Sequence, residues 1–324
     1  MADGTEIEEA GAGMNGYSRF LTGLVAATHT PMHADGQINL AAIDQQAAHL
    51  AASPVTGAFI CGSTGESHSL TVAERMSVAR RWQEARDRAK LKLIVHVGHN
   101  CQADACALAA QAREIGADAI SAMAPCYFKP AATEDLIDFL APIAAAAPEL
   151  PFYFYDIPAL TGVNVALGEF LRAGRQRIPN LAGIKFTSSN LMALQECLEA
   201  DDGQFNILFG TDEMLLGALA LGVHGAVGST YNYAAALYTK LIAAHQAGDN
   251  VTAQALQMQS VKLVQVLLPF GVLPAGKALM SLVGVDCGPV RPPVRPLRED
   301  QKARLFRQVE ALGILEQSLA GAAR

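Results

Sequence analysis

The sequence contains no apolar run close to the ~18 residues that a membrane-spanning helix requires. Its first residues, MADGTEIEEAGAGMNGYS, also lack the basic segment and apolar core of a secretory signal, and they are acidic and glycine-rich. These two absences argue against a membrane protein and a secreted one. We therefore expect a cytoplasmic protein with a flexible N-terminal tail over residues 1–18.

Basic residues are outnumbered: 24 lysines and arginines stand against 31 aspartates and glutamates, which gives a formal net charge of -7. Nucleic-acid binders usually carry a basic patch, so this balance argues against a nucleic-acid partner. An anionic small molecule remains a possible ligand. Local groups in its site must then attract it, because the overall field of the protein does not.

Cysteine motifs are absent as well. None of the six cysteines forms a CxxC pair, and several lie in apolar stretches: Cys61, Cys101, Cys106, Cys126, Cys197 and Cys287. Reduced thiols that pack as small apolar side chains are favoured over a disulfide framework.

Apolar residues make up 51% of the 324 residues, enough for the large core of a single large domain. Eight short and mostly continuous apolar segments recur along the chain, and many contain valine, isoleucine or aromatic residues. This pattern is typical of strands that are covered on both faces. The segments are 23–31, 57–63, 92–99, 119–125, 152–158, 181–188, 205–212 and 225–230.

Helical patterns lie between these segments. Thr71 and Glu74 have the spacing of a capping box, and Thr133 is expected to be the N-cap of another helix. Eight strands alternating with helices predict a (β/α)8 TIM barrel over residues 19–248. The rival is a doubly wound open sheet, which is weakened because no GxGxxG follows the first strand. From residue 249 to 324 the strand signal stops, and we expect a C-terminal helical extension.

The active site of a closed parallel barrel lies at the carboxyl ends of its strands. Polar residues gather at these ends in the present sequence. They are Ser63 and Thr64, Tyr155 and Asp156, Lys185 and Thr187, Gly210 to Glu213, and Ser229 and Thr230.

Lys185 lies inside the apolar segment LAGIKF, where a lysine without a partner is rare. Because strand side chains alternate, Lys185 faces into the barrel if Ile184 and Phe186 meet the helices. Burial is costly for an ammonium group and favours the free amine, which can attack a ketone to form a Schiff base. The alternative is a structural ion pair with a carboxylate such as Asp212.

Two further features have both a catalytic and a structural interpretation. Tyr155 ends a strand rich in aromatic residues, so it is either a phenol that relays protons or a core side chain. The segment GSTGES places Ser63 and Thr64 between glycines, where backbone N–H groups can bind an anion. A simple turn into a helix also explains that segment.

His96 and His99 form the pattern HVGH at a strand end. A metal site needs more ligands, and the sequence has no HExxH motif and no cysteine cluster. Two ordinary strand-end histidines are favoured, although a metal-dependent barrel lyase built on them stays open.

Taken together, the segments GSTGE, YDIPALTG, GIKFT, GTDE and GAVGSTYN resemble those of a known family. They look like the pyruvate-dependent class I aldolases typified by N-acetylneuraminate lyase and dihydrodipicolinate synthase, over nearly the whole chain from about residue 20. The resemblance implies that Lys185 forms the Schiff base and that Tyr155 relays protons. It further implies that Ser63 and Thr64 hold the carboxylate of a small-molecule 2-oxo acid, that no metal or organic cofactor is needed, and that the protein is a homotetramer.

Within the family, Leu160 stands where the synthases carry an arginine for a second carboxylate, a contact that an apolar side chain cannot make. The sequence is more similar to the N-acetylneuraminate lyases, which cleave N-acetylneuraminate to N-acetylmannosamine and pyruvate. In those enzymes the matching positions bind the polyol tail of the sugar. Here they are Thr187, Gly210, Asp212, Glu213 and Ser229.

Two positions depart from the family pattern. Asp156 follows the tyrosine where related sequences often have another polar residue, and Tyr127 matches a tyrosine that assists the proton relay in the synthases but varies among lyases. The alternatives are a 2-keto-3-deoxy sugar-acid aldolase or dehydratase of the same family, the metal-dependent lyase mentioned above, and a barrel that only binds a sugar acid.

Overall fold

The computed structural model describes residues 21–315, except for the side chains of residues 87 and 88. The tail predicted over residues 1–18 lies outside the described residues.

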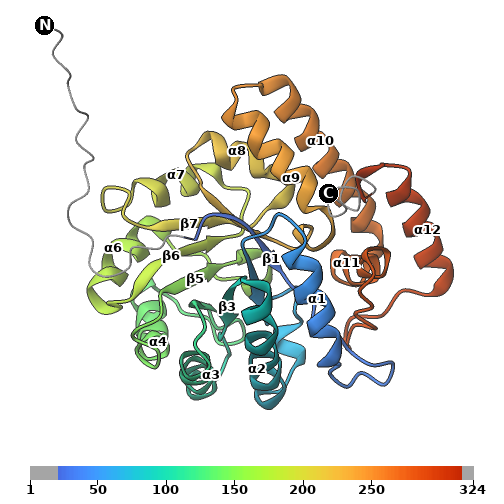
Figure 1. Cartoon of the computed structure of the whole chain (residues 1–324). Helices are drawn as coiled ribbons and strands as arrows, with labels where there is room; N and C mark the ends of the chain where they lie inside the picture. The colour runs from blue at the N-terminus through green and yellow to red at the C-terminus, as the bar shows by residue number, and fades with distance from the viewer. Residues whose placement is uncertain (1–20, 316–324) are drawn as a thin grey trace, which may run out of the picture.

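Eight parallel strands form a closed barrel in which each strand pairs with the next along the chain and β8 pairs with β1 (Figure 1). The predicted TIM barrel is therefore confirmed, and the open sheet is wrong. Each strand ends before its apolar segment does, because the last residues of the segment turn into the loops at the barrel mouth. The strands are β1 (Gly23–Ala27), β2 (Gly57–Ile60), β3 (Lys92–His96), β4 (Ala119–Met123), β5 (Phe152–Asp156), β6 (Leu181–Phe186), β7 (Asn206–Phe209) and β8 (Gly225–Gly228).

Two apolar clusters explain why the strand sequences are apolar on both faces. One cluster lies inside the barrel and includes Val25, Phe59 and Leu208. The other lies between the strands and the surrounding helices and includes Phe154 and Ile184. Alternate residues of a strand enter one cluster or the other, so nearly every strand position is buried.

The helices surround the barrel (Figure 1).

Two helix starts were predicted from capping residues. Thr71 caps α2 with the predicted capping box, in which the backbone N–H of Glu74 donates to Thr71 and the Glu74 carboxylate accepts from Thr71. The prediction for Thr133 is wrong: it is the first residue of α4, and the carboxylate of Asp135 accepts from the backbone in front of it. The helices are α1 (Ala41–Ala51), α2 (Val72–Ala89), α3 (Gln102–Glu114), α4 (Thr133–Ala145), α5 (Pro158–Thr161), α6 (Leu167–Arg177), α7 (Leu191–Glu199), α8 (Leu215–Ala220) and α9 (Tyr231–Gln246), with 3-10 turns η1 (Ser67–Ser69) and η2 (Asp212–Met214).

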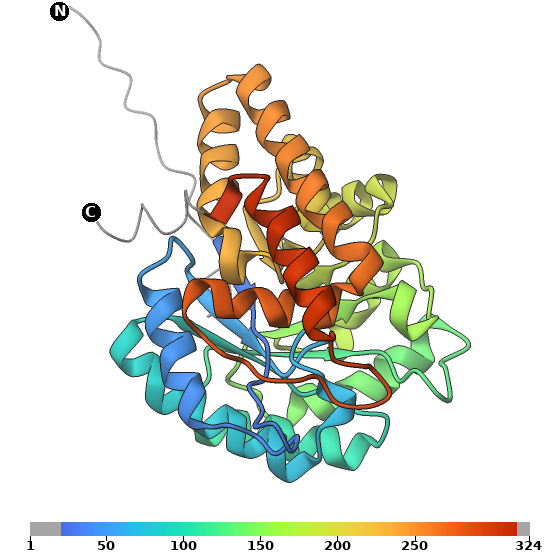
Figure 2. The ribbon, with the colours of Figure 1, turned by 90° about the vertical axis from the view of Figure 1, so that its right-hand side faces the viewer.

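The remaining helices are α10 (Asn250–Leu267), η3 (Leu268–Phe270), α11 (Val272–Leu279), η4 (Met280–Val283) and α12 (Glu299–Glu310). Figure 2 shows them, in orange and red, grouped on one side of the barrel, and α10 packs along α9. The gap between α9 and α10 coincides with the predicted start of the extension at residue 249.

Within residues 21–315, no single helix has both the length and the apolar composition needed to cross a membrane. Two consecutive helical segments, residues 250–270 and 272–283, reach the required length and apolar composition only when they are taken together. The chain bends by 111° between them.

Candidate active site

Lys185 points into the barrel, as predicted from strand alternation. It is 3% exposed, and its Cα partner on the neighbouring strand is Tyr155. The Lys185 Nζ lies 3.7 Å from the centre of the Tyr155 ring and 5.3 Å from that of Phe59. It donates a hydrogen bond to Thr187 Oγ1 at 3.2 Å. The amine is thus held between aromatic faces and a hydroxyl at the carboxyl end of β6.

Within residues 21–315, Lys185 forms no ion pair with a carboxylate. The carboxylate of Asp212, which sequence analysis offered as a structural partner, bonds to Thr230 instead. The contacts of Lys185 therefore favour the nucleophile interpretation over a structural ion pair.

Tyr155 faces the same interior. Its ring meets Phe59 and His96 edge-on, with centroids 5.7 Å and 5.6 Å away, and only 4% of the residue is exposed. Its hydroxyl lies 3.3 Å from Ser63 Oγ, which reaches it from the other side of the barrel. The packing of the ring is that of a core residue, while the hydroxyl is turned toward the strand ends.

The loop after β2 carries Ser63 and Thr64 in a tight conformation. Cys61 and Glu66, at its two ends, have left-handed backbones with φ of 55° and 60°, a conformation that costs energy for residues other than glycine. A Cβ on Gly65 would lie 3.0 Å from the Cys61 nitrogen. The segment GSTGES is therefore a turn into η1, as its structural interpretation predicts, and the turn is held in a constrained conformation at the barrel mouth.

The five predicted polyol-binding residues follow three neighbouring strands. Thr187 follows β6, Gly210 to Glu213 follow β7, and Ser229 follows β8. A Cβ on Gly228 would overlap the Asp212 carboxylate, so only glycine allows that carboxylate to lie against β8. The structure brings these residues to one side of the mouth, next to Lys185.

Asp212 is held by a hydrogen-bond network that the sequence did not predict. Its Oδ2 accepts from the Thr230 N–H at 3.0 Å and from the Thr230 hydroxyl at 2.6 Å. That hydroxyl lies 2.7 Å from the Tyr238 hydroxyl, and Ser260 of α10 donates to the Asp212 carbonyl at 3.2 Å. Burial raises the pKa of the Asp212 carboxyl to about 6, against the opposing effect of the Thr230 bonds.

Asp156 lies outside the barrel interior. It shares its strand face with Phe154, which belongs to the cluster between strands and helices, and its Cα partner is Phe186 of the same cluster. Burial raises the pKa of Asp156 to about 7, and the charge of Lys185 opposes that rise. Its departure from the family pattern therefore changes the outer layer and not the reacting face.

Tyr127 is not brought to this site. It lies in the loop after β4, is 78% exposed, and packs against the ring of Phe128. Its ring contact is thus with Phe128 and not with Tyr155 or Lys185, and its predicted role in the relay stays a prediction.

The two histidines do not form a metal site together. His96 is buried in the barrel beside Tyr155, whereas the His99 Nδ1 accepts from the backbone N–H of Cys101 at 3.0 Å. Among the described residues, the ligand atoms that converge are those of His99, Cys101 and Asp104, a group on the protein surface that excludes His96. This separation argues against a metal-dependent lyase built on the pair.

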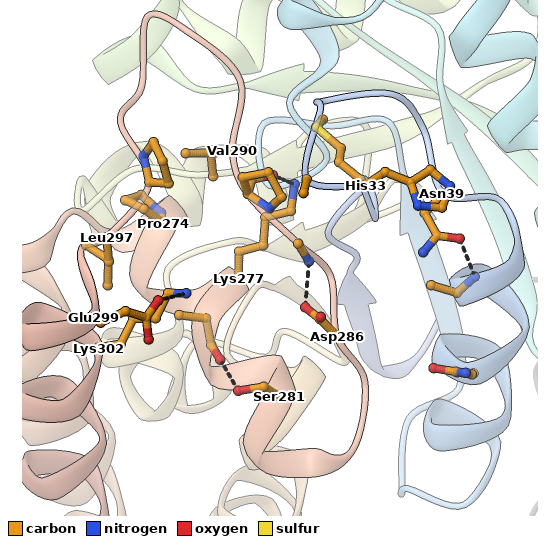
Figure 3. A pocket seen from close by; sticks show the side chains of 18 of the residues that line it. His33, Asn39, Pro274, Lys277, Ser281, Asp286, Val290, Leu297, Glu299 and Lys302 are labelled. Atoms are coloured by element: carbon orange, nitrogen blue, oxygen red, sulfur yellow. Dashed lines mark hydrogen bonds and ion pairs between the residues drawn. The ribbon is translucent and has the colours of Figure 1, made fainter.

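A cavity of about 850 Å³ lies elsewhere, between the extension and the loop before α1. Figure 3 shows Lys277 and Val290 on its extension side and His33 and Asn39 facing them. None of the predicted site residues lines it.

Comparisons with known proteins agree with the fold and identify the family. The model of the Dihydrodipicolinate synthetase family matches residues 20–312. The N-acetylneuraminate lyase of Rattus norvegicus is 39% identical over 300 residues, which are 91% of this chain and 93% of the relative. N-acetylneuraminate lyase A of Xenopus laevis is 42% identical over 278 residues, covering 85% and 90%. The solved structure of Proteus mirabilis N-acetylneuraminate lyase superposes with a TM-score of 0.89 at 41% identity, over 92% of this chain and 100% of that one.

Proposed function

The chain belongs to the dihydrodipicolinate synthetase family of lyases, and from this premise we propose that it cleaves N-acetylneuraminate to N-acetylmannosamine and pyruvate through a Schiff base on Lys185. One observation carries the proposal. The buried amine of Lys185, which has no carboxylate partner among residues 21–315, lies 3.7 Å from the centre of the Tyr155 ring, and the Tyr155 hydroxyl lies within reach of Ser63.

The reaction begins when the neutral amine of Lys185 adds to the C2 ketone of the open-chain sugar acid. Loss of water gives a protonated imine. The carboxylate next to C2 binds to the hydroxyls and N–H groups of Ser63 and Thr64, which fixes the ketone over the amine.

Carbon–carbon cleavage follows. Tyr155 removes the proton of the C4 hydroxyl, with the substrate carboxylate placed to assist, and the C3–C4 bond breaks. The bonding pair moves to the imine nitrogen, so N-acetylmannosamine leaves as the aldehyde and an enamine remains. Protonation at C3 and hydrolysis release pyruvate and restore the free Lys185. The imine takes up the electron pair, so these steps require no metal.

Substrate choice is assigned to the residues that follow β6, β7 and β8. The carboxylates of Asp212 and Glu213 suit a polyhydroxylated tail because they accept hydrogen bonds from neighbouring hydroxyls. Leu160 offers no charge for a second substrate carboxylate and is 65% exposed.

The proposal is tested by measuring pyruvate release from a panel of sialic acids and shorter 2-keto-3-deoxy acids. N-acetylneuraminate should give the highest kcat/KM. A clear preference for a short 2-keto-3-deoxy acid would replace the sialic-acid assignment with the sugar-acid alternative.

We predict that Asp212→Asn and Glu213→Gln impair cleavage of N-acetylneuraminate by about 10- to 100-fold, since each removes a charge-assisted contact to the polyol. Trapping of pyruvate on Lys185 by borohydride should stay within threefold of the parent protein, because pyruvate has no polyol tail. Both assays are run on each variant. Variants that cleave N-acetylneuraminate like the parent would contradict the assigned role.

The raised pKa of Asp212 predicts a pH dependence. The free protein holds the acid form below pH about 6 and the ionised form, which accepts from hydroxyls, above it. We expect kcat/KM for N-acetylneuraminate to fall as pH decreases through about 6, with a slope approaching tenfold per unit. The Asp212→Asn variant should show a flatter acidic limb. An unchanged limb in that variant would assign it to another group, with Asp156 the first to examine.

We also propose that the protein acts as a cytoplasmic homotetramer. Three exposed apolar side chains, Tyr127, Phe128 and Leu160, support a subunit interface near the loops after β4 and β5. These loops meet where Lys129 lies against Gly162. Light scattering of the full chain measures the assembly directly.

A further inference from the structure

A fully buried ion pair joins the extension to the loop after β2. Lys277 of α11 and Glu66 have side chains that are 1% and 2% exposed, and the Lys277 Nζ lies 2.7 Å from Glu66 Oε1. The same ammonium donates to the Pro289 carbonyl at 2.6 Å. Figure 3 shows Lys277 rising from its helix along the cavity wall. The pair links residues 211 positions apart in the chain.

Glu66 is connected directly to the residues that face the active site. Its backbone N–H donates to the Ser63 carbonyl at 3.1 Å, across the turn that contains Thr64. Its second carboxylate oxygen accepts from the Arg291 N–H at 2.8 Å. Both oxygens of Glu66 are therefore held by the extension, and Glu66 keeps a left-handed backbone that needs such support.

The Arg291 side chain forms a second contact between the extension and the segment that follows β2. Its guanidinium donates to both oxygens of Glu74, at 2.8 Å and 2.5 Å, and to the Ser69 carbonyl at 2.9 Å. This contact lowers the pKa of Glu74 to about 2. The extension thus binds the segment after β2 at two places, at Glu66 and at Glu74 in the first turn of α2.

The Lys277–Glu66 ion pair also affects the charge near the predicted substrate site. Glu66 is an acid only a few residues from Ser63 and Thr64, which are assigned to bind the carboxylate of the substrate. A buried carboxylate without a cation would repel that anion and would itself be costly. Lys277 cancels the charge while it fixes the position of Glu66.

We propose that Lys277 is a positioning residue of the carboxylate site, acting through Glu66 on Ser63 and Thr64, an inference that rests on the proposed function. The C-terminal extension is then a working part of the active site. It decides how tightly the 2-oxo acid group is held, without touching the substrate.

The test compares pyruvate with its uncharged ester, methyl pyruvate, by borohydride trapping on Lys185 in the full-length protein. Lys277→Met should raise the half-saturating concentration of pyruvate by about 10- to 100-fold, because Glu66 is left without its cation. The value for methyl pyruvate should change less than threefold. Lys277→Arg, which keeps the charge, should restore pyruvate trapping to within threefold of the parent.

Lys302→Met is the matched control. Lys302 lines the same cavity but pairs with Glu299 at the surface, where the two side chains are 38% and 88% exposed. Its loss should change neither probe. If Lys277→Met does not fold, Lys277→Gln is used instead, since its amide keeps N–H donors near Glu66 and Pro289 and removes the charge, on a side chain one bond shorter.

Equal changes for pyruvate and methyl pyruvate, or no change for either in a folded variant, would overturn the inference and leave Lys277 a structural residue. Failure of the parent protein to trap pyruvate at all would instead overturn the proposed function. The two failures are therefore distinguishable in one set of measurements.

Discussion

Replacing Lys185 by methionine is expected to abolish N-acetylneuraminate cleavage, with a loss on the order of 10⁶-fold, the scale on which enzymes lose rate when their nucleophile is removed. In the parent, pyruvate and borohydride should add a stable mass to the peptide that contains Lys185, and in the variant they should not. The variant should fold, because methionine replaces a buried amine that has no carboxylate partner within residues 21–315. Peptide mass spectrometry and circular dichroism measure both points.

Lys92→Met is the control for that experiment. Lys92 also lies on a barrel strand, but at its amino end, where it pairs with Asp118 and is 42% exposed. It should keep both activity and trapping. Labelling of any lysine other than Lys185 would refute the Schiff-base assignment, and loss of activity in EDTA that zinc restores would revive the metal alternative.

Tyr155→Phe has the second largest expected effect, a loss of roughly 10²–10⁴-fold in kcat, which is the usual contribution of general acid–base catalysis. The substitution removes the hydroxyl near Ser63 and keeps the ring that packs on Phe59 and His96. Folding should be unaffected. Pyruvate should still be trapped on Lys185, since imine formation with a small ketone does not depend on the C4 proton.

Tyr153 provides a matched comparison on the same strand and the same face. Its hydroxyl donates to Asn206 at 2.9 Å, at the end of the barrel remote from Lys185. Tyr153→Phe should therefore cost about 1 kcal/mol of folding free energy and leave kcat unchanged. If the two variants were equally active, Tyr155 would be a core residue.

The parts of the fold that depend on local pattern could be predicted from the sequence. Continuous apolar segments indicated strands buried on both faces, and their alternation with helices indicated the barrel. Strand parity placed Lys185 inside, because Ile184 and Phe186 had to meet the helices. The polar residues at the strand ends then fell at one mouth, which follows from the closed parallel topology alone.

What the sequence could not provide are contacts between distant segments. The bond from Thr230 to the Asp212 carboxylate, and that between Lys277 and Glu66, join residues whose approach depends on how whole elements pack. No local periodicity encodes such distances. Tyr127 is a second example of what local sequence does not determine. Its motif matched a relay tyrosine, but the conformation of its loop leaves it 78% exposed.

The pairing of β1 with β8 has a consequence for how the protein reaches its native state. The first strand acquires its second neighbour only after almost all of the barrel sequence has left the ribosome, so contacts of high sequence separation dominate and folding is slow. Until β8 arrives, β1 and β7 are open edges lined with apolar side chains, which favour association between unfinished chains. The Lys277–Glu66 contact is made later still, so the anion-binding loop reaches its final geometry only after α11 and the segment that follows it have been synthesised.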